Sequence, residues 1–367
     1  MSLATFSRAL SHSVDHFFPT PQFLLPKSSG IDISDSSIKW LTLNDEGLQK
    51  SIASWGNEPL AGGIVKGGII QNQAALSERL AQIKPHIKAH AAHAALPEEA
   101  AYVFGMHVPH GSNRAHILSM IEFEFDGRVP LPASSAVYDY SVIAEGEEGI
   151  EIGVVVFAKE LAESYASAFA GAGIELLSLE VEAQSIARSA SSTDTAEPIT
   201  LLVDFGRART GFAVIKRGVP IFSSTVEVGG DSMAETLQRA FGYSHEVAQK
   251  YWNTEGLIGA SGGKSAIEAI LPTVSALADE IERHFRYWDS RRNEEGKRVT
   301  PVGKILLLGG SSNIRGLPEY IAGRVHAEVE YANVWRHICN TDTYIPEITR
   351  RDSLQFATAA GLALRDF

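Results

Sequence analysis

Two short segments, about half a chain apart, each place an aspartate at the end of an apolar run and follow it with small polar residues. The residues concerned are Asp32, Ser34, Ser36, Ser37 and Lys39 in the first segment, and Asp204, Gly206 and Thr210 in the second. Backbone N–H groups and hydroxyls that converge in such a turn form a concave site for an anion such as phosphate. A carboxylate repels phosphate, but it can hold Mg²⁺ through the water molecules that this ion keeps. The segments predict a site for phosphates and their metal, with Asp32 and Asp204 as the metal-holding residues.

Two glycine pairs follow further apolar runs. They are Gly229-Gly230 and Gly309-Gly310, the second followed by Ser311. A glycine pair at the end of a buried strand lets a phosphate or a flat ring approach the backbone. Ligands of open α/β sheets lie beyond the carboxyl ends of the strands, where we expect these glycines. Lys39 has two interpretations: it offsets phosphate charge, or it is a solvated strand lysine.

Apolar periodicity predicts the elements that must position these residues. Strands are expected within 30–43, around a polar turn, and at 136–143, 151–157, 199–205, 211–216 and 304–308. Helices are expected at 74–90, 159–170, 232–241, 245–251, 271–293 and 354–364. Aspartate beside small polar residues is common in turns, so neither segment alone indicates a binding site. Their repetition indicates a duplicated architecture with a cleft between its halves, and the block at 110–165 indicates a compact α+β insert within the first half.

The composition argues against several classes of function. The 32 Lys and Arg residues against 44 Asp and Glu give a formal net charge of −12, which argues against a general nucleic-acid surface. The single cysteine, Cys339, excludes an internal disulfide framework and is typical of a reducing compartment. No apolar run is long enough to span a bilayer, and the start lacks a secretory signal, so we expect a cytoplasmic protein.

Residues 1–20 carry apolar side chains at helical spacing. The apolar face would consist of Leu3, Phe6, Leu10, Val14 and Phe17. The opposite face is rich in serine and histidine, so its attraction to anionic lipid would be weak. The predicted amphipathic helix either docks on a neighbouring domain or partner, or anchors the chain to a membrane.

The order of these features resembles the actin, Hsp70 and sugar-kinase superfamily. The matching features are the Asp32 hairpin, Glu182 on a connecting helix, the Asp204-Phe205-Gly206 hairpin, the two glycine pairs and a final helix of small residues. Within this superfamily the chain resembles the PilM family of type IV pilus assembly proteins. The segments that carry this are Ile121-Glu-Phe-Glu-Phe125, Val129-Pro-Leu-Pro132, Tyr138-Asp-Tyr140 and Val226-Glu-Val-Gly-Gly-Asp231.

The resemblance spans roughly residues 28–367 and implies an α/β, actin-like (ribonuclease H-like) duplicated fold. Two lobes would surround a nucleotide cleft, with a small α+β subdomain inserted in the first lobe. The expected parts are a tail with the amphipathic helix (1–27), a first lobe (28–195) with the insert at about 110–165, a second lobe (199–353), and a C-terminal helix (354–367) that returns to the first lobe.

The resemblance also implies roles for individual residues. The first phosphate motif matches Asp32, Ser34, Ser36, Ser37 and Lys39, the second Asp204, Gly206 and Thr210, and the adenosine motif Gly309, Gly310 and Ser311. Gly229 and Gly230 belong to the same nucleotide set, and Glu246 and Lys250 lie near the helix that contacts ribose in relatives. Glu182 falls where relatives orient the attacking water, which makes it the candidate catalytic residue.

Three residues depart from the family pattern. Ser34 replaces the usual glycine of the first turn, and Arg207 and Arg209 stand in a second turn that is normally made of small residues. An arginine fork fits phosphate oxygens, but it can also crowd them. We expect these departures to affect nucleotide hydrolysis more than nucleotide binding.

The function implied by the resemblance is an ATP-binding scaffold, with ATP and Mg²⁺ as cofactors, for the type IV pilus or competence machinery. Its partner would be the N-terminal cytoplasmic peptide of a PilN-like inner-membrane protein, bound by the insert through strand addition. The protein would lie at the inner face of the membrane and would bind no nucleic acid. Whether it forms homo-oligomers stays open. Two alternatives stay open, a small-molecule kinase of the superfamily and an FtsA-like filament-forming division protein. The insert offers no framed carboxylate base, which a kinase needs, and residues 363–367 lack an FtsA-like anchor.

Overall fold

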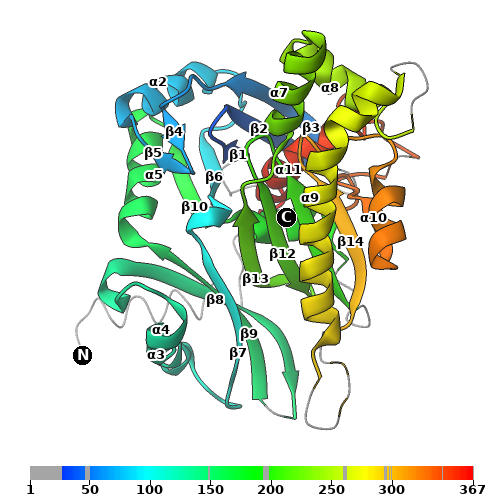
Figure 1. The fold of residues 1–367 in the computed structure, drawn as a ribbon. Helices are drawn as coiled ribbons and strands as arrows, with labels where there is room; N and C mark the ends of the chain where they lie inside the picture. The colour runs from blue at the N-terminus through cyan, green and yellow to red at the C-terminus, as the bar shows by residue number, and fades with distance from the viewer. Residues whose placement is uncertain are drawn as a thin grey trace.

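The computed structural model describes residues 27–45, 50–147, 149–192, 198–258, 263–292, 296, 298, 300–340 and 342–366. Two large sheets form the centre of the molecule, and helices cover them (Figure 1). The amphipathic helix predicted in residues 1–20 lies outside the described ranges. Within those ranges, every helix is too short or too polar to cross a bilayer.

The first sheet has the strand order β10-β6-β1-β2-β3. Its strands are β1 (Ser28–Ile33), β2 (Ser37–Asp45), β3 (Lys50–Pro59), β6 (Ala91–Leu96) and β10 (Glu175–Val181). β1, β6 and β10 are parallel, whereas β1, β2 and β3 form an antiparallel meander. Every residue of β1 and β6 is buried, so these strands carry small and apolar residues instead of an alternating pattern.

The second sheet repeats this arrangement and then extends it. Its order is β15-β14-β11-β12-β13-β7-β9-β8. Its strands are β7 (Tyr102–Val108), β8 (Ala136–Gly146), β9 (Gly149–Ala158), β11 (Ile199–Phe205), β12 (Thr210–Lys216), β13 (Val219–Val226), β14 (Val302–Leu308) and β15 (Glu328–Tyr331). β14 and β15 run parallel to β11, and β11, β12 and β13 form an antiparallel meander. The first five strands therefore match the first sheet position by position, which is the predicted duplication.

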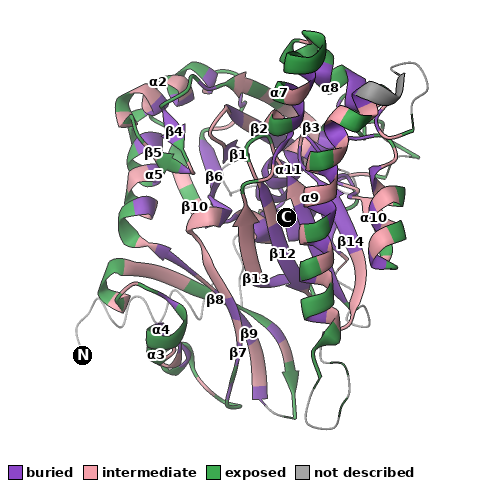
Figure 2. Ribbon diagram, in the orientation of Figure 1, coloured by how far each residue is buried: buried purple, intermediate pink, exposed green. Residues whose placement is uncertain are grey.

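Helices cover both sheets, and short strands and 3₁₀ turns connect them. The helices are α2 (Gln73–Ile83), α3 (Arg114–Phe123), α4 (Phe125–Arg128), α5 (Lys159–Gly171), α6 (Glu182–Ala190), α7 (Gly230–Phe241), α8 (His245–Thr254), α9 (Gly263–Ser290), α10 (Leu317–Val325) and α11 (Ala357–Ala363). The remaining elements are β4 (Val65–Lys66), β5 (Ile69–Ile70), η2 (Glu98–Ala100), η3 (Ala133–Ser135) and η4 (Asp352–Phe356). Buried residues concentrate in the strands of the two sheets, and exposed residues lie on the outer faces of helices such as α5 and α10 (Figure 2).

The helix predicted at 74–90 is shorter than expected. α2 begins after Asn72, whose side chain accepts the backbone N–H of Ala75, and it ends at Ile83. Pro85 lies directly beyond, and proline has no N–H with which to continue the helical hydrogen bonds. The segment that follows turns into the buried strand β6.

We expected an insert at about 110–165 as part of the first lobe. The strands of this region, β8 and β9, pair with β7 and continue the second sheet. β7 and β13 pair at Phe104 and Phe222, and β9 and β8 continue the sheet outward. The chain order puts the insert in the first half, while backbone pairing puts it at the edge of the second sheet. α5, at the end of the predicted insert, packs against α2 beside the first sheet.

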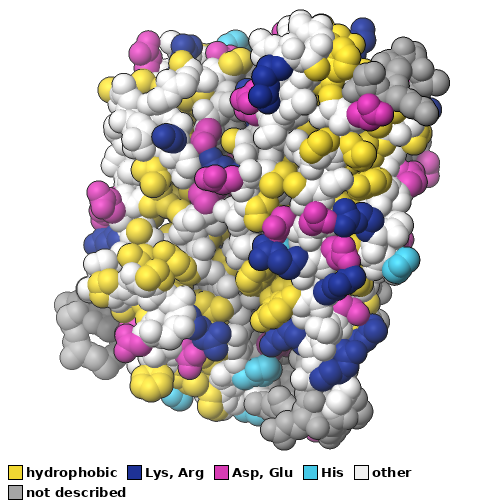
Figure 3. Space-filling model, viewed as in Figure 1, with side chains coloured by type: hydrophobic (Ala, Val, Ile, Leu, Met, Phe, Trp, Pro, Cys, Tyr) yellow, Lys and Arg dark blue, Asp and Glu magenta, His cyan; other side chains and the backbone are white. Residues whose placement is uncertain are grey.

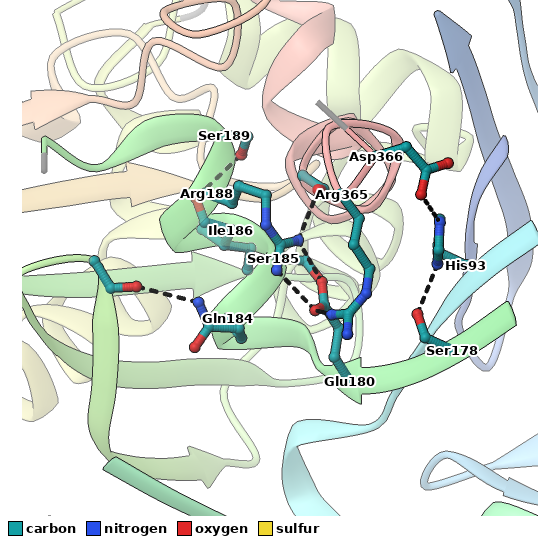
Figure 4. Close-up of polar contacts among 12 residues, drawn as sticks. His93, Ser178, Glu180, Gln184, Ser185, Ile186, Arg188, Ser189, Arg365 and Asp366 are labelled. Atoms are coloured by element: carbon teal, nitrogen blue, oxygen red, sulfur yellow. Dashed lines mark hydrogen bonds and ion pairs between the residues drawn. The ribbon is translucent and has the colours of Figure 1, made fainter. Parts of the chain in front are cut away.

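The C-terminal helix α11 lies against α6 and β1. Gly361 makes this approach possible, because a Cβ atom there would lie 1.7 Å from the carbonyl oxygen of Ser185. The residues after the helix are held by polar contacts (Figure 4). Arg365 pairs with Glu180, and Asp366 lies 2.8 Å from His93 Nε2. The end of the chain is thus fixed to the first sheet through β6 and β10.

Glu180 is the centre of these contacts. Its two oxygens accept hydrogen bonds from Arg188 at 2.6 and 2.8 Å. Burial alone would raise the pKa of Glu180, but the hydrogen bonds and charge of Arg188, with Ser185 and Arg365, hold that pKa below its usual value. A buried carboxylate with this many donors stays charged and ties three segments together.

Replacing Gly361 by alanine tests the packing of α11. The added methyl group cannot fit against the backbone of Ser185, so we expect the free energy of unfolding to fall by about 1–3 kcal/mol, the range for overpacked cores. Gly323 in α10 is the matched control, since a Cβ atom there meets nothing within 4 Å. Gly323→Ala should be neutral or stabilising, because alanine is the better helix former. Urea unfolding of both variants measures the difference, and equal stabilities would contradict the packing argument.

Candidate functional site

The carboxyl ends of the parallel strands carry the acidic residues. Asp32 lies near the end of β1, Glu182 follows β10 directly, and Asp204 lies near the end of β11. Parallel strands end at a common edge, and the duplicated meanders place the two aspartates at equivalent positions. The structure therefore brings together the acids that the sequence singled out.

The first turn is held by its own serines. The Ser34 hydroxyl donates to the carbonyl oxygen of Ser37 at 3.1 Å and accepts the backbone N–H of Ser37 at 3.2 Å. The carbonyl oxygen of Ser36 accepts the N–H of Leu60 at 2.8 Å. Ser34 thus shapes the turn with its side chain where a glycine was expected to shape it by backbone freedom.

Lys39 faces Asp32 across the β1–β2 hairpin. The two residues are register partners, and Lys39 Nζ lies 3.6 Å from Asp32 Oδ2. Their side chains are only 13% and 10% exposed, so Lys39 is not a solvated strand lysine. Its charge is directed at the acids and at any phosphate that binds beside them.

The second turn packs closely against the first glycine pair. Gly206 donates its N–H to the carbonyl oxygen of Arg209 at 3.0 Å, and its own carbonyl accepts the N–H of Gly230 at 3.1 Å. A Cβ atom on Gly229 would lie 2.2 Å from the carbonyl oxygen of Arg207. The Thr210 hydroxyl donates to the carbonyl oxygen of Val228 at 2.6 Å. The hydroxyl proton that the sequence assigned to phosphate is therefore used to hold β12 against the glycine pair.

The second glycine pair completes the arrangement. Gly309 has φ +93°, and a Cβ atom there would lie 2.3 Å from Asp204 Oδ1. A Cβ atom on Gly230 would lie 2.2 Å from the hydroxyl oxygen of Ser311. The Ser311 N–H donates to the carbonyl oxygen of Phe205 at 3.0 Å. The first glycine pair, Gly309, Ser311 and Asp204 thus lie close together, whereas Gly310 lies towards Gln355.

Glu246 and Lys250 lie on α8, which packs against α7. Both are exposed on α8. Among the described residues, no side-chain hydrogen bond or ion pair joins either of them to the glycine turns. Their predicted contact with ribose stays a prediction.

Glu98 belongs to this acidic group, and the sequence analysis missed it. It follows β6 and is 5% exposed. Its Oε2 accepts the backbone N–H of Ala183 at 2.9 Å, at the start of α6, while its Oε1 is buried without a hydrogen-bond partner among the described residues. A signal was present in the sequence, because Pro97-Glu98-Glu99 ends an apolar run in the same way as the segment at Asp32 does.

The acids raise one another's pKa values. Burial is the main cause for Asp204, and with the Asp32 charge it raises the pKa of Asp204 to about 6, against the opposing charge of Lys39. Burial raises the pKa of Glu98 to about 7, with a smaller contribution from Asp204. The pKa of Glu182 is raised well above its usual value by burial and by the charges of Asp32, Glu98 and Asp204. A group of carboxylates in this condition favours a nearby cation.

The residues present fit Mg²⁺ with a nucleotide. The donor set is carboxylate oxygen, which Mg²⁺ prefers, and the orphaned Oε1 of Glu98 is one of its atoms. Within the described residues, no three His, Cys, Asp or Glu side chains form a metal site by themselves. Such a geometry suits an ion that keeps several water ligands. At Gly230 and Gly309 a Cβ atom would collide with Ser311 and Asp204, so glycine lets these turns pack together beside the acids.

The two arginines of the second turn point to different partners. Arg207 lies 3.1 Å from Asp231, at the start of α7. Arg209 pairs with Asp35 in the first turn and with Glu99 in η2. The sequence analysis singled out both arginines but neither of the two partners of Arg209.

Comparison with known proteins agrees with this architecture. The model of the family described as type IV pilus assembly protein PilM matches residues 30–367. The chain belongs to the PilM family. Among solved structures, the chain in the PilM-PilN type IV pilus biogenesis complex is similar, with a TM-score of 0.75 and 21% identity over 93% of this chain and 98% of that one.

Two further structures place this PilM family member among actin-like folds. One is the ethanolamine utilization protein EutJ from Carboxydothermus hydrogenoformans, with a TM-score of 0.54 and 16% identity over 94% of this chain and 91% of that one. The other is MreB5 of Spiroplasma citri bound to ADP, with a TM-score of 0.50 and 13% identity over 92% of this chain and 95% of that one. The fold predicted from the sequence is confirmed.

The raised pKa of Glu98 predicts how the stability of this PilM family member depends on pH. Its pKa is higher in the folded chain than in the unfolded chain, so the folded state holds its proton more tightly. The contribution of Glu98 to stability is therefore full at low pH and is lost as the pH rises from about 4.5 to about 7, at most about 3 kcal/mol. Asp204 and Glu182 act in the same direction.

Glu98→Gln should flatten this fall, because glutamine has no charge to bury. Urea unfolding between pH 5 and 8 measures how stability depends on pH. A smaller dependence should remain in the variant, because Asp204 and Glu182 still titrate. Glu78, exposed on α2, gives the control variant Glu78→Gln, which should follow the wild-type profile. A Glu98→Gln profile parallel to that of the wild type would show that Glu98 does not carry the effect.

Proposed function

We propose that this PilM-type actin-like protein binds Mg·ATP between its two hairpin turns and acts as a scaffold in type IV pilus assembly. The observation that carries the proposal is the convergence of Asp32, Asp204, Gly230 and Gly309 at the ends of the strands. Acids that hold the waters of Mg²⁺, beside tight turns of small residues, are what a metal and its phosphates require. The ADP bound to the similar MreB5 supports the nucleotide assignment.

Each residue has a role in this proposal. Asp32 and Asp204 hold the waters of Mg²⁺, and Lys39 offsets phosphate charge. The turn residues Ser34, Ser36, Ser37, Gly206, Gly229 and Gly230 bind phosphate, and Gly309, Gly310 and Ser311 lie against adenosine. Glu182 orients water. We propose that hydrolysis is slow, since the hydroxyls of Ser34 and Thr210 are engaged in the turns.

We propose the insert as the docking site for the N-terminal cytoplasmic peptide of a PilN-like membrane protein, which would place the scaffold at the inner face of the membrane. The similarity to the chain in the PilM-PilN complex supports a partner of this kind. β7 pairs with β13 only at Phe104, and within the described ranges β9 alone pairs with residues 105–108, while Ile221 of β13 packs beside Gly105. A strand with a free edge accepts an extended peptide.

A cavity lies beside this free edge. Its volume is about 530 Å³, and Gly105, Met106 and His107 of β7 line it together with residues of α3 and α4. Phe123, at the end of α3, lines the cavity and is 85% exposed. Hydrophobic side chains also appear on the surface in the region of α3 and α4 (Figures 1 and 3). We propose that an apolar side chain of the peptide enters this cavity.

Asp204→Asn tests nucleotide binding. Mg·ATP should raise the melting temperature of the wild type, because a ligand that binds only the folded state stabilises it. The variant should melt no lower than the wild type, since it loses a buried charge next to Asp32, but it should lose the shift with Mg·ATP. Asp126→Asn, exposed on α4, should keep the shift. A full Mg·ATP shift in Asp204→Asn would overturn the proposal.

Phe123→Ala tests the docking site. Titration with the N-terminal peptide of the PilN-like protein should show binding at least about tenfold weaker, as expected when an aromatic anchor is removed. Val142 is the control, because it is 57% exposed on β8, the other free edge of the insert. Val142→Ala should bind as the wild type does. The reverse outcome would place the peptide on β8, and no binding to the wild type, with or without ATP, would argue against a scaffold.

A further inference from the structure

Arg209 links the two halves of the duplicated fold. It is the last residue of the turn between β11 and β12, and its guanidinium group pairs with the carboxylates of Asp35 and Glu99. Asp35 lies in the turn between β1 and β2, and Glu99 lies in η2 after β6. One side chain from the second half therefore contacts two separate segments of the first.

Both sides of this contact are fixed to the backbone. Asp35 also accepts the N–H groups of Gly67 and Gly68, each at 3.0 Å. The carbonyl oxygen of Arg209 accepts the N–H of Gly206 at 3.0 Å, which closes the second turn. Because Asp35 and the backbone of Arg209 are already held in place, little additional conformational freedom is lost when their ion pair forms.

The environment makes these ion pairs stronger than ordinary surface pairs. The side chains of Arg209, Asp35 and Glu99 are 25%, 28% and 20% exposed, so water screens them only in part. The guanidinium group is planar and always charged, and it can serve two carboxylates at once. Arg207, two residues earlier, contributes nothing to this link because its partner, Asp231, belongs to the second half as well.

We propose that Arg209, Asp35 and Glu99 form an ion-pair clasp that holds the two hairpin turns together. The two turns carry the residues proposed to bind phosphate, so the clasp fixes the spacing of this region by pairing within the chain. Salt should weaken the clasp, since ionic screening acts on partly exposed charges.

Amide hydrogen exchange of the full chain without nucleotide tests the clasp. Arg209→Gln and Glu99→Gln should each raise the exchange rate of residues 34–37 and 206–210 by about tenfold, because local opening exposes these amides. The double variant should exchange no faster than about the faster single variant, since each substitution breaks the same interaction. Arg207→Gln is the matched control and should leave residues 34–37 at the wild-type rate.

A salt series keeps the test independent of any small loss of stability in the variants. Raising KCl from about 0.05 to about 1 M should increase exchange of both turns in the wild type, and it should change Arg209→Gln little. Unchanged exchange in Arg209→Gln, or the same salt response in that variant and the wild type, would overturn the clasp. The experiment contains no nucleotide, so its outcome does not depend on whether Mg·ATP binds.

Discussion

The site depends on one constraint: negatively charged residues are gathered where the two duplicated sheets meet. Asp32, Glu98, Glu182 and Asp204 stand at the carboxyl ends of parallel strands, and burial keeps water from screening them. Lys39 is close enough to offset part of this charge. Burial first, and the remaining repulsion second, raise the pKa values of Glu98, Glu182 and Asp204. A cation relieves such repulsion, and for this reason the same residues that destabilise the folded chain at high pH are the ones suited to a metal with phosphates.

Duplication explains why so much of the fold could be predicted from sequence. The runs at 30–43 and 199–216 each give a strand, a tight turn and a strand, and each delivers an aspartate to the turn. Local patterns of this kind depend on near neighbours, so periodicity detects them. The order of strands in space does not follow from periodicity. The insert therefore appeared to belong to the first half, whereas a single pairing of Phe104 with Phe222 attaches it to the second sheet.

The site was predictable to the extent that its residues share one turn. Asp32, Gly206 and the glycine pairs carry their own local signature. Arg209 carries no such local signature, because its role depends on Asp35 and Glu99. These residues are far from it in sequence and lie beside it only in the folded chain. Thr210 shows the opposite error: its type suits phosphate, but its proton is already donated to the carbonyl oxygen of Val228. Residue type indicates what a side chain can do, and the surrounding backbone determines which bond it makes.

The start of α6 connects the acids to the rest of the fold. Glu98 accepts the N–H of Ala183 there, and the partial positive charge of a helix N-terminus favours the charged form of both Glu98 and Glu182. Burial and neighbouring acids favour the neutral form more strongly, as the pKa values show. α6 itself is held by Arg188 on Glu180 and by α11 at Gly361. A change in the charge of the acids therefore acts at the start of a helix whose later part is held by Arg188 and α11.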